Sequence, residues 1–274
     1  MPPPPMRSPS SPAPAAQPAV SKEWKIQHGV NPGIGVVCVF GCGGSGKSSL
    51  VANAAKAGLR PFIADVENGA RYLDVPKVSG ITSFTELRSL LQDHALLSEF
   101  DLICVDSLTT AQELCAKHVL DTIPKTDQGA KATSIENYGY GKGLVYVYEQ
   151  FLLLLSDLDA LRRAGKSIVT ICHDCTANVP NPAGDNWIRY EPRLQSPASG
   201  NASIRLRVRE WCDHLLFIGY DVAVEDGKGR GAGTRCIYPQ EMPTHMAKSR
   251  ALEHPIPYER GSCDLWNLLL GKGA

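Results

Sequence analysis

Short, continuous apolar runs alternate with longer amphipathic segments from Ile34 onward. Runs such as GVVCVF, FDLICVD and SIVTIC contain few polar positions, which is typical of strands buried on both faces of a parallel sheet. The pattern predicts strands over 34–40, 61–66, 101–106 and 167–172, with helices over about 47–57, 84–97, 108–120 and 144–163. Because strands and helices alternate, we expect an α/β fold with a mainly parallel sheet flanked by helices.

Local signals refine this picture at two helix starts and beyond residue 200. The pairs Ser83/Glu86 and Thr110/Glu113 match capping boxes. The run SIRLRVR alternates like a strand with one solvated arginine face, and DHLLFIGYDV and TRCIYP flank a glycine-rich turn, EDGKGRGAG. These runs predict a C-terminal antiparallel extension of the sheet.

Residues 1–20, MPPPPMRSPSSPAPAAQPAV, are rich in Pro, Ser and Ala. Such a segment forms neither a helix nor a ladder and buries little surface, so we expect a disordered tail. The remaining residues, 21–274, are enough for a single α/β domain with its own core.

Charge and cysteine content narrow the classes of function. The 28 basic and 28 acidic residues give zero net charge, so any nucleic-acid contact must come from a local patch. No apolar run is long enough to span a bilayer, and the N-terminus lacks the apolar core of a secretory signal. The nine cysteines are scattered, which does not suggest a disulfide framework. We therefore expect a reduced, cytoplasmic protein with no membrane partner.

The octapeptide from Gly41 to Ser48 matches G-x-x-x-x-G-K-[ST], with an apolar strand before it and a helix-compatible run after it. In this motif backbone N–H groups hold phosphate oxygens, Lys47 reaches the β- and γ-phosphates, and the Ser48 hydroxyl binds Mg²⁺. The alternative is a flexible glycine loop, a chance match expected in on the order of one chain in a hundred. The predicted nucleotide site comprises Gly41, Cys42, Gly43, Gly44, Ser45, Gly46, Lys47, Ser48 and Ser49.

Two carboxylates follow predicted strands at the edge of the sheet where ligands bind. Asp106 ends the run FDLICVD, and we expect it to join Ser48 in holding Mg²⁺. Glu67 ends RPFIADVE, which predicts a place near the γ-phosphate and a role in activating water. Asp65 competes for that role, and Glu67 could instead be a surface turn residue before Asn68.

His173 follows the run KSIVTIC, where a P-loop enzyme can sense the γ-phosphate. The alternative is a zinc ligand together with Cys172 and Cys175. A structural zinc site needs four ligands, usually from two such pairs, and the sequence holds no second CxxC. The metal interpretation is therefore the weaker one.

Together these motifs resemble the RecA-type branch of the P-loop ATPases. More narrowly, they resemble the phage nucleotide-binding ATPases regarded as RecA-like single-strand-annealing recombinases. The resemblance covers roughly residues 34–257 and rests on VFGCGGSGKSSL, PFIADVENGARYLDV, FDLICVDSLT, SIVTICH and MAKSRALEHPIP. It implies a RecA-like core, ATP and Mg²⁺ as cofactors, Glu67 as the water-activating carboxylate and His173 at the γ-phosphate switch position.

The last of these segments contains Lys248-Ser249-Arg250. It resembles the paired basic finger that RecA-type proteins insert into a neighbouring subunit's active site, where a cation neutralises charge on the transferred phosphoryl group. The alternative is a solvated basic pair in a loop. The resemblance implies activity only as an oligomer, ring or filament, although no N-terminal helical polymerisation domain is evident.

Two long segments interrupt the core and combine cations with aromatic side chains, as single-strand binders do. The resemblance implies that they face DNA, and the alternative is that they are lids or subunit contacts. The first, 122–143, holds Lys125, Lys131, Tyr138, Tyr140 and Lys142. The second, 174–209, holds Trp187, Arg189, Tyr190, Arg193, Arg205, Arg207 and Arg209.

These observations predict an oligomeric, DNA-stimulated ATPase that acts on single-stranded DNA in phage recombination or annealing. A single-strand-binding protein is a further candidate partner. Three alternatives remain open: a RecA-fold helicase-type motor, a P-loop kinase that acts on a small molecule within one subunit, and a nucleotide switch with negligible hydrolysis.

Overall fold

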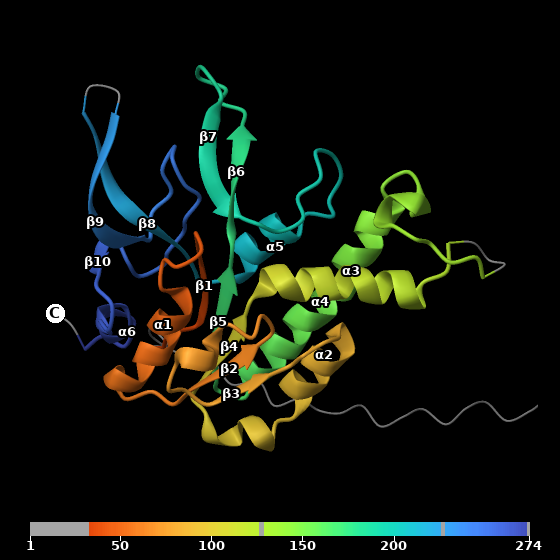
Figure 1. Ribbon diagram of the computed structural model, residues 1–274, viewed down its shortest axis with the longest axis horizontal. Coiled ribbons are helices and arrows are strands. Elements are labelled where there is room, and N and C mark those ends of the chain that lie inside the picture. The colour runs from red at the N-terminus through yellow and green to blue at the C-terminus, as the bar shows by residue number, and fades with distance from the viewer. Residues whose placement is uncertain (1–32, 126–128, 226–227, 273–274) are drawn as a thin grey trace, which may run out of the picture. The chain divides into compact units, whose positions relative to one another are not determined.

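An eight-stranded sheet in the order β10-β9-β8-β1-β5-β4-β2-β3 forms the centre of the fold (Figure 1). The computed structural model describes residues 33–125, 129–225 and 228–272, so the tail predicted over 1–20 lies outside the described residues. Six strands run parallel: β1 (Val36–Gly41), β2 (Pro61–Asp65), β3 (Lys77–Ser79), β4 (Leu102–Asp106), β5 (Ser167–Cys172) and β8 (His214–Glu225). Beyond β8, the strands β9 (Lys228–Tyr238) and β10 (Ile256–Tyr258) add antiparallel pairings.

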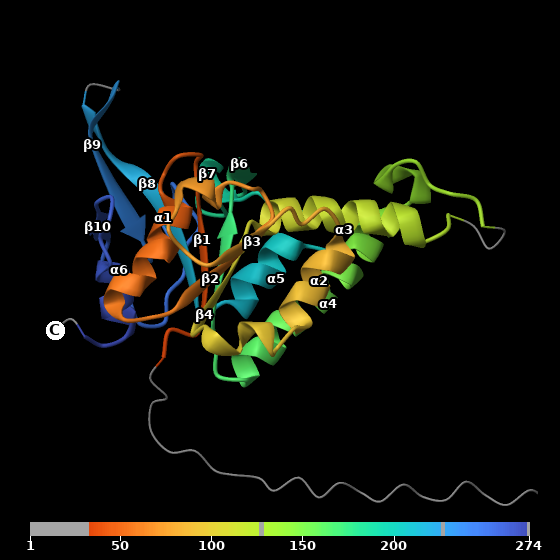
Figure 2. The ribbon, with the colours of Figure 1, turned by 60° about the horizontal axis from the view of Figure 1, so that its bottom comes forward.

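Helices cover both faces of the sheet because successive residues of the buried strands point to opposite sides. In β1, Val36, Cys38 and Phe40 face one core, whereas Val37 and Val39 face the other. Figure 2 shows four helices on the first side: α2 (Phe84–Gln92), α3 (Leu108–Thr122), α4 (Lys142–Arg163) and α5 (Ile204–Trp211). On the second side lie α1 (Lys47–Ala52), which continues as a 3-10 turn, η1 (Asn53–Ala57), and α6 (Asp264–Leu269). The remaining 3-10 turns are η2 (Ala70–Tyr72), η3 (Leu96–Glu99) and η4 (Ile135–Tyr138).

The predicted α/β architecture is confirmed: a mainly parallel sheet with flanking helices and a C-terminal antiparallel extension. One predicted strand is wrong, because SIRLRVR forms most of α5. Ser203 caps this helix by accepting a hydrogen bond from the Leu206 amide, and Ile204 and Val208, four residues apart, bury the same face. Alternation over seven residues therefore gave the wrong period.

Of the two predicted capping boxes, one is confirmed and one is wrong. Ser83 and Glu86 form the complete capping box of α2. The prediction for Thr110 and Glu113 is wrong because α3 begins at Leu108, three residues earlier than a cap at Thr110 would require. Its N-cap is Ser107, whose Oγ accepts a hydrogen bond from the Thr110 amide. The Thr110 hydroxyl is thereby free to contact another element.

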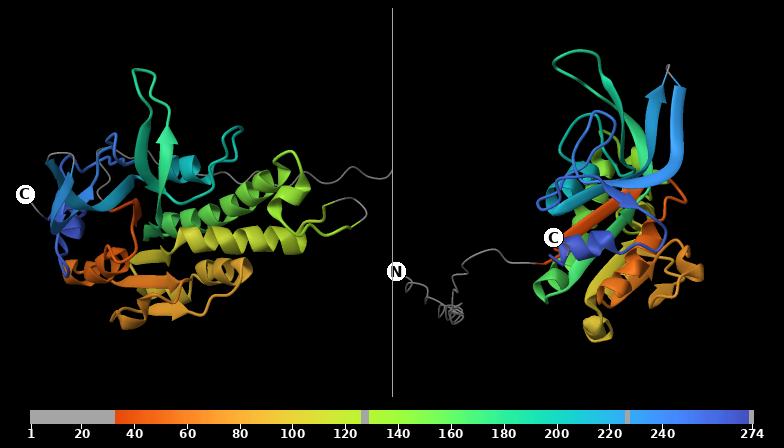
Figure 3. Two further views of the ribbon diagram at one scale, coloured as in Figure 1. Left: turned by 45° about the horizontal axis from the view of Figure 1, so that its top comes forward. Right: turned by 90° about the vertical axis from the view of Figure 1, so that its left-hand side faces the viewer.

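The segment predicted as a loop over 174–209 contains a separate antiparallel pair, β6 (Asp174–Val179) and β7 (Trp187–Pro192), before α5. Figure 3 shows the β6–β7 and β8–β9 hairpins projecting on the same side. Buried Arg189 and Glu191 pair with each other and, respectively, with Glu241 and Arg205, which ties the hairpin to the core. Among the described residues, no helix is long and apolar enough to cross a bilayer.

Candidate nucleotide-binding site

The glycine-rich loop lies between the end of β1 and the start of α1, as the motif requires. A Cβ at Gly41 would lie 2.3 Å from the Ile218 carbonyl oxygen, so β8 packs too closely against the loop for any side chain. The Lys47 ammonium folds back over the loop and donates to the Gly41 and Cys42 carbonyls at 2.7 and 2.8 Å. Burial lowers the pKa of Lys47, and the opposing charge of Asp106 limits that shift.

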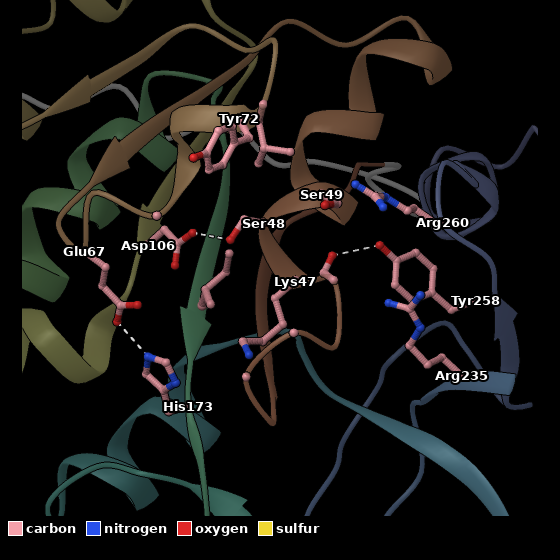
Figure 4. A pocket seen from close by; sticks show the side chains of 16 residues that line it. Lys47, Ser48, Ser49, Glu67, Tyr72, Asp106, His173, Arg235, Tyr258 and Arg260 are labelled. Carbon is pink, nitrogen blue, oxygen red and sulfur yellow. Dashed lines mark hydrogen bonds and ion pairs between the residues drawn. The ribbon is translucent and has the colours of Figure 1, made fainter. Parts of the chain in front are cut away.

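The loop lines a cavity of about 460 Å³ at the carboxyl ends of the strands. Figure 4 shows Glu67, Asp106 and His173 at one end of this cavity, with Lys47 and Ser48 beside them. Tyr72, Ser49, Tyr258, Arg235 and Arg260 line the other parts. The topology therefore brings the main residues predicted from separate motifs into one pocket.

Ser48 and Asp106 form a close pair in this pocket. The Ser48 hydroxyl donates to Asp106 Oδ2 at 2.5 Å. Burial raises the pKa of Asp106 to about 6; the Ser48 hydrogen bond opposes this shift, and the charges of Glu67 and Asp65 add to it. A hydroxyl and a buried carboxylate at a phosphate-binding loop suit a hard cation such as Mg²⁺, whose charge would stabilise the ionised carboxylate.

Glu67 is held by three side chains from two other elements. Its Oε1 accepts hydrogen bonds from Ser107 Oγ, from Thr110 Oγ1 at 2.8 Å and from His173 Nε2 at 2.8 Å. Burial raises the pKa of this carboxyl, but the three hydrogen bonds outweigh burial and hold the pKa below its usual value. Glu67 is thus an ionised, oriented group in the cavity and not a surface turn residue.

Asp65, the alternative to Glu67, has a structural position. Its fully buried carboxylate accepts hydrogen bonds from the amides of Gly69 and Ala70 and from the Ser79 hydroxyl, at 2.9 to 3.2 Å. These bonds occupy both oxygens and shape the turn that follows β2. Asp65 is also absent from the residues that line the cavity.

His173 connects the cavity to the β6–β7 hairpin. Its backbone amide donates to Thr109 Oγ1 at 3.1 Å, and its carbonyl accepts from the Arg193 amide at 2.8 Å. The zinc alternative has no geometric support, since no group of three or more His, Cys, Asp or Glu side chains in the described part of the chain could hold a metal ion. Cys172 instead packs in the core with its Sγ 3.8 Å from Cys38 Sγ.

Lys248 and Arg250 lie away from the cavity of their own subunit. The Lys248 backbone pairs with Leu215 near the start of β8, and its ammonium donates to the Arg209 carbonyl at 2.8 Å. Arg250, whose side chain is 66% exposed, forms an ion pair with Asp213 at 3.1 Å. Neither residue lines the pocket, so their predicted role as a finger concerns a neighbouring subunit and stays a prediction.

The candidate DNA-contacting residues separate into buried and exposed groups. Tyr138 is buried and donates its hydroxyl to backbone carbonyls of Val119 and Ile123. Arg189, Arg205 and Arg209 form ion pairs with Glu191 or Glu241. The side chains that remain exposed are Lys125, Lys131, Tyr140, Lys142, Trp187, Tyr190, Arg193 and Arg207.

Sequence reasoning missed seven pocket residues: Gly69, Tyr72, Leu73, Ile171, Arg235, Tyr258 and Arg260. The last three come from or directly follow β9 and β10, about 190 or more residues after the loop they contact. No motif marks them. The one sequence feature that pointed toward them was the predicted C-terminal antiparallel extension, which places these strands in the same sheet but does not give their distance from the loop.

The fold and this site define a P-loop NTPase. A model of the AAA domain matches residues 35–251, and the chain therefore belongs to this family. A search of curated proteins finds no match. Among solved structures, a KaiC-like protein from the hyperthermophilic archaeon Pyrococcus horikoshii OT3 is 11% identical, with a TM-score of 0.44 over 82% of this chain and 86% of that chain.

Proposed function

We propose that the protein binds and hydrolyses ATP with Mg²⁺ at this cavity. The observation that carries the proposal is the convergence of Lys47, the Ser48–Asp106 pair and Glu67 on one pocket. Bound Mg²⁺ would supply charge neutralisation for the β- and γ-phosphates. The two carbonyls that now satisfy Lys47 belong to the loop itself, so a phosphate oxygen could replace them without an unpaired buried cation.

Glu67 would orient and activate water in this reaction. Its low pKa keeps the carboxylate ionised near neutral pH, and the hydroxyls of Ser107 and Thr110 fix one oxygen while the other stays available. General bases contribute roughly 10² to 10⁴ in rate when they are positioned in this way. His173 touches the same carboxylate and would report the state of the γ-phosphate.

The proposed polymer substrate is single-stranded DNA, in recombination or annealing of the phage RecA-like type. Exposed Trp187 on β7 offers a stacking surface, and exposed Arg193 follows the same strand. Tyr190 is also partly exposed, but one face of its ring stacks on Phe217, which leaves the other face for a base. The β6–β7 hairpin begins directly after His173. Single-stranded DNA bound to the hairpin would therefore contact the segment that directly follows His173, the residue that faces the nucleotide in the cavity.

The proposed active form is an oligomer, ring or filament. This rests on Lys248 and Arg250, which cannot complete their own pocket from their position beside the start of β8. A cation supplied by a neighbouring subunit would stabilise charge on the transferred phosphoryl group. A helicase-type motor would use the same parts, and strand separation would distinguish it.

Steady-state ATP turnover at several protein concentrations, with and without single-stranded DNA, tests this proposal; Lys47→Ala is the control for the site. We expect the rate per subunit to rise with concentration and with DNA. Turnover independent of both would mean that one subunit completes the site, which favours a kinase. ATP binding without turnover would favour a nucleotide switch.

A further inference from the structure

Three side chains from the C-terminal part of the chain donate hydrogen bonds to backbone carbonyls of the P-loop and α1. Arg235 Nη1 donates to the Ser45 carbonyl at 2.8 Å, Tyr258 Oη to the Gly46 carbonyl at 2.8 Å, and Trp266 Nε1 to the Leu50 carbonyl at 2.7 Å. The donors follow their acceptors by 190, 212 and 216 residues. Arg235 and Tyr258 lie in β9 and β10, so the antiparallel extension of the sheet contacts the P-loop directly, whereas Trp266 lies in α6 and contacts the helix that follows the loop.

The contact between this extension and the P-loop leaves no free space at Gly46. A Cβ there would lie 3.0 Å from Arg235 Nη1 and 3.0 Å from both Tyr258 Oη and Tyr258 Cε1. The Arg235 guanidinium also lies over the Tyr258 ring, 5.6 Å from its centroid. Because Gly46 also has a φ of 100°, glycine is required both by conformation and by this packing.

Each pinned carbonyl fixes the direction of an amide. In a trans peptide the C=O and the N–H of the following residue lie in one plane and point in opposite directions. A hydrogen bond that fixes the direction of the C=O therefore also fixes the direction of that N–H. The Ser45 carbonyl belongs to the same peptide as the Gly46 N–H, and the Gly46 carbonyl to the same peptide as the Lys47 N–H. The Gly46 carbonyl also accepts a hydrogen bond from the Leu50 amide at 2.8 Å, so Tyr258 adds to a restraint that α1 supplies, whereas the Ser45 carbonyl is held by Arg235. No acceptor in the described part of the chain receives a hydrogen bond from either of these two amides.

We propose that Arg235 and Tyr258 are positioning residues for phosphate binding: by holding the Ser45 and Gly46 carbonyls outward, they keep the Gly46 and Lys47 N–H groups aimed at the nucleotide phosphates. This inference rests on the proposed binding of ATP at the loop. Preorganised amides bind an anion without first reorienting the loop, which lowers the entropic cost of binding. This preorganisation would raise the affinity for any polyphosphate ligand, whether or not the ligand carries a nucleotide base.

Trp266 provides a matched comparison. It makes the same kind of bond to α1, but the Leu50 carbonyl lies in the body of the helix, away from the two amides. Trp266→Phe should lower the melting temperature through loss of a buried hydrogen bond, with little effect on phosphate affinity. Tyr258→Phe removes only a hydroxyl, whose partner is the Gly46 carbonyl within the phosphate-binding loop.

The test is calorimetric titration of wild type, Tyr258→Phe, Arg235→Lys and Trp266→Phe with Mg·ATP and with Mg·tripolyphosphate, plus steady-state kinetics. We expect Tyr258→Phe to raise both Kd values by about 2- to 3-fold, at the low end of one hydrogen bond, because the Leu50 amide still holds the Gly46 carbonyl. Arg235→Lys, which keeps the charge but not the fork geometry, should raise both in the same direction. KM for ATP should rise while kcat is kept, and Trp266→Phe should bind both ligands as wild type does.

Three results would overturn the inference while leaving the proposed function intact. One is wild-type affinity in both Tyr258→Phe and Arg235→Lys. Another is a loss of affinity for ATP alone, which would place the Tyr258 hydroxyl on the base or ribose. The third is an equal loss in Trp266→Phe, which would make the effect one of general stability. If wild type binds neither ligand, or Lys47→Ala binds as wild type does, the proposed function fails and the inference with it.

Discussion

Glu67 shows how individual residues define this site. Its carboxylate carries one oxygen that accepts from Ser107, Thr110 and His173, so its orientation depends on the start of α3 and the end of β5. A carboxylate fixed in this way is already oriented before a reaction begins, so no conformational entropy is lost in positioning it. The same bonds make the residue sensitive to any change at His173.

Glu67→Gln should separate binding from hydrolysis. The amide has nearly the same shape but cannot act as a base, so ATP affinity should stay within about 3-fold of wild type while turnover falls about 100-fold or more. Single-turnover hydrolysis together with ATP titration measures both. A wild-type rate would assign water activation to another group, and Glu67→Asp would show whether a displaced carboxylate suffices.

Asp106 should make the nucleotide-free protein less stable as pH rises. Its pKa is about 6 in the fold and near 3.8 when exposed, so the folded state binds the extra proton between these values. Stability from this group is therefore fully present below about pH 4 and lost as pH rises through 6. Asp106→Asn should remove this dependence and be more stable at pH 7 by about 1 to 3 kcal/mol. Urea unfolding at pH 4.5 and pH 7 measures the difference, and identical pH profiles would contradict it.

At this scale the sequence predicted the residues that lie in contiguous motifs. Lys47 and Ser48 follow from local spacing, because a strand, a tight loop and a helix start place them without help from distant chain. Asp106 follows from its position at the end of a second buried strand, because parallel strands bring their carboxyl ends to one edge of the sheet. Arg235 and Tyr258 could not be found in this way, since their positions depend on where β9 and β10 join the sheet. Tyr138 was misjudged because composition does not show whether an aromatic ring is buried.

Some of the elements around the site form because of their local sequence pattern, whereas others depend on tertiary contacts. The buried strands were predictable because short, continuous apolar runs are typical of strands that are covered on both faces of a parallel sheet. Helix α5 was not, because Ile204, Leu206 and Val208 fit alternation as well as a helix, and tertiary packing selected the helix with Leu206 exposed. Hairpin β6–β7 depends on the ion pairs of Arg189 and Glu191, which no local pattern predicts.

The hairpin is the element that should contact DNA. Trp187→Ala removes an exposed ring from β7, and a lost base stack of about 1 to 3 kcal/mol would weaken single-strand binding by roughly 5- to 150-fold. Tyr140→Ala is the matched control, because it removes a fully exposed ring from the other candidate segment. Fluorescence anisotropy with labelled oligonucleotides compares them. An effect of Tyr140→Ala alone would transfer the DNA contact to residues 122–143, and no effect of either would argue against both.

At the scale of the whole molecule, the proposed function predicts active sites that are shared between subunits. Lys47→Ala subunits have an intact basic finger but no working loop, whereas Lys248→Ala/Arg250→Ala subunits have the reverse defect. Mixing the two should restore part of the ATP turnover that each lacks, since some interfaces combine a good loop with a good finger. Native mass spectrometry would verify mixing, and no recovery in proven mixed oligomers would exclude a finger acting between subunits.

The central claim is that the Gly41–Ser48 loop is the site of nucleotide binding, and the most direct measurement is titration of Mg·ATP into wild type and Lys47→Ala. Lys47 is the buried cation of the pocket, and its removal takes away a charged contact to the phosphates. We predict saturable binding by wild type and a loss of affinity of about 100-fold or more in a variant that melts as wild type does. Unchanged affinity in the folded variant would contradict the assignment of this cavity to nucleotide.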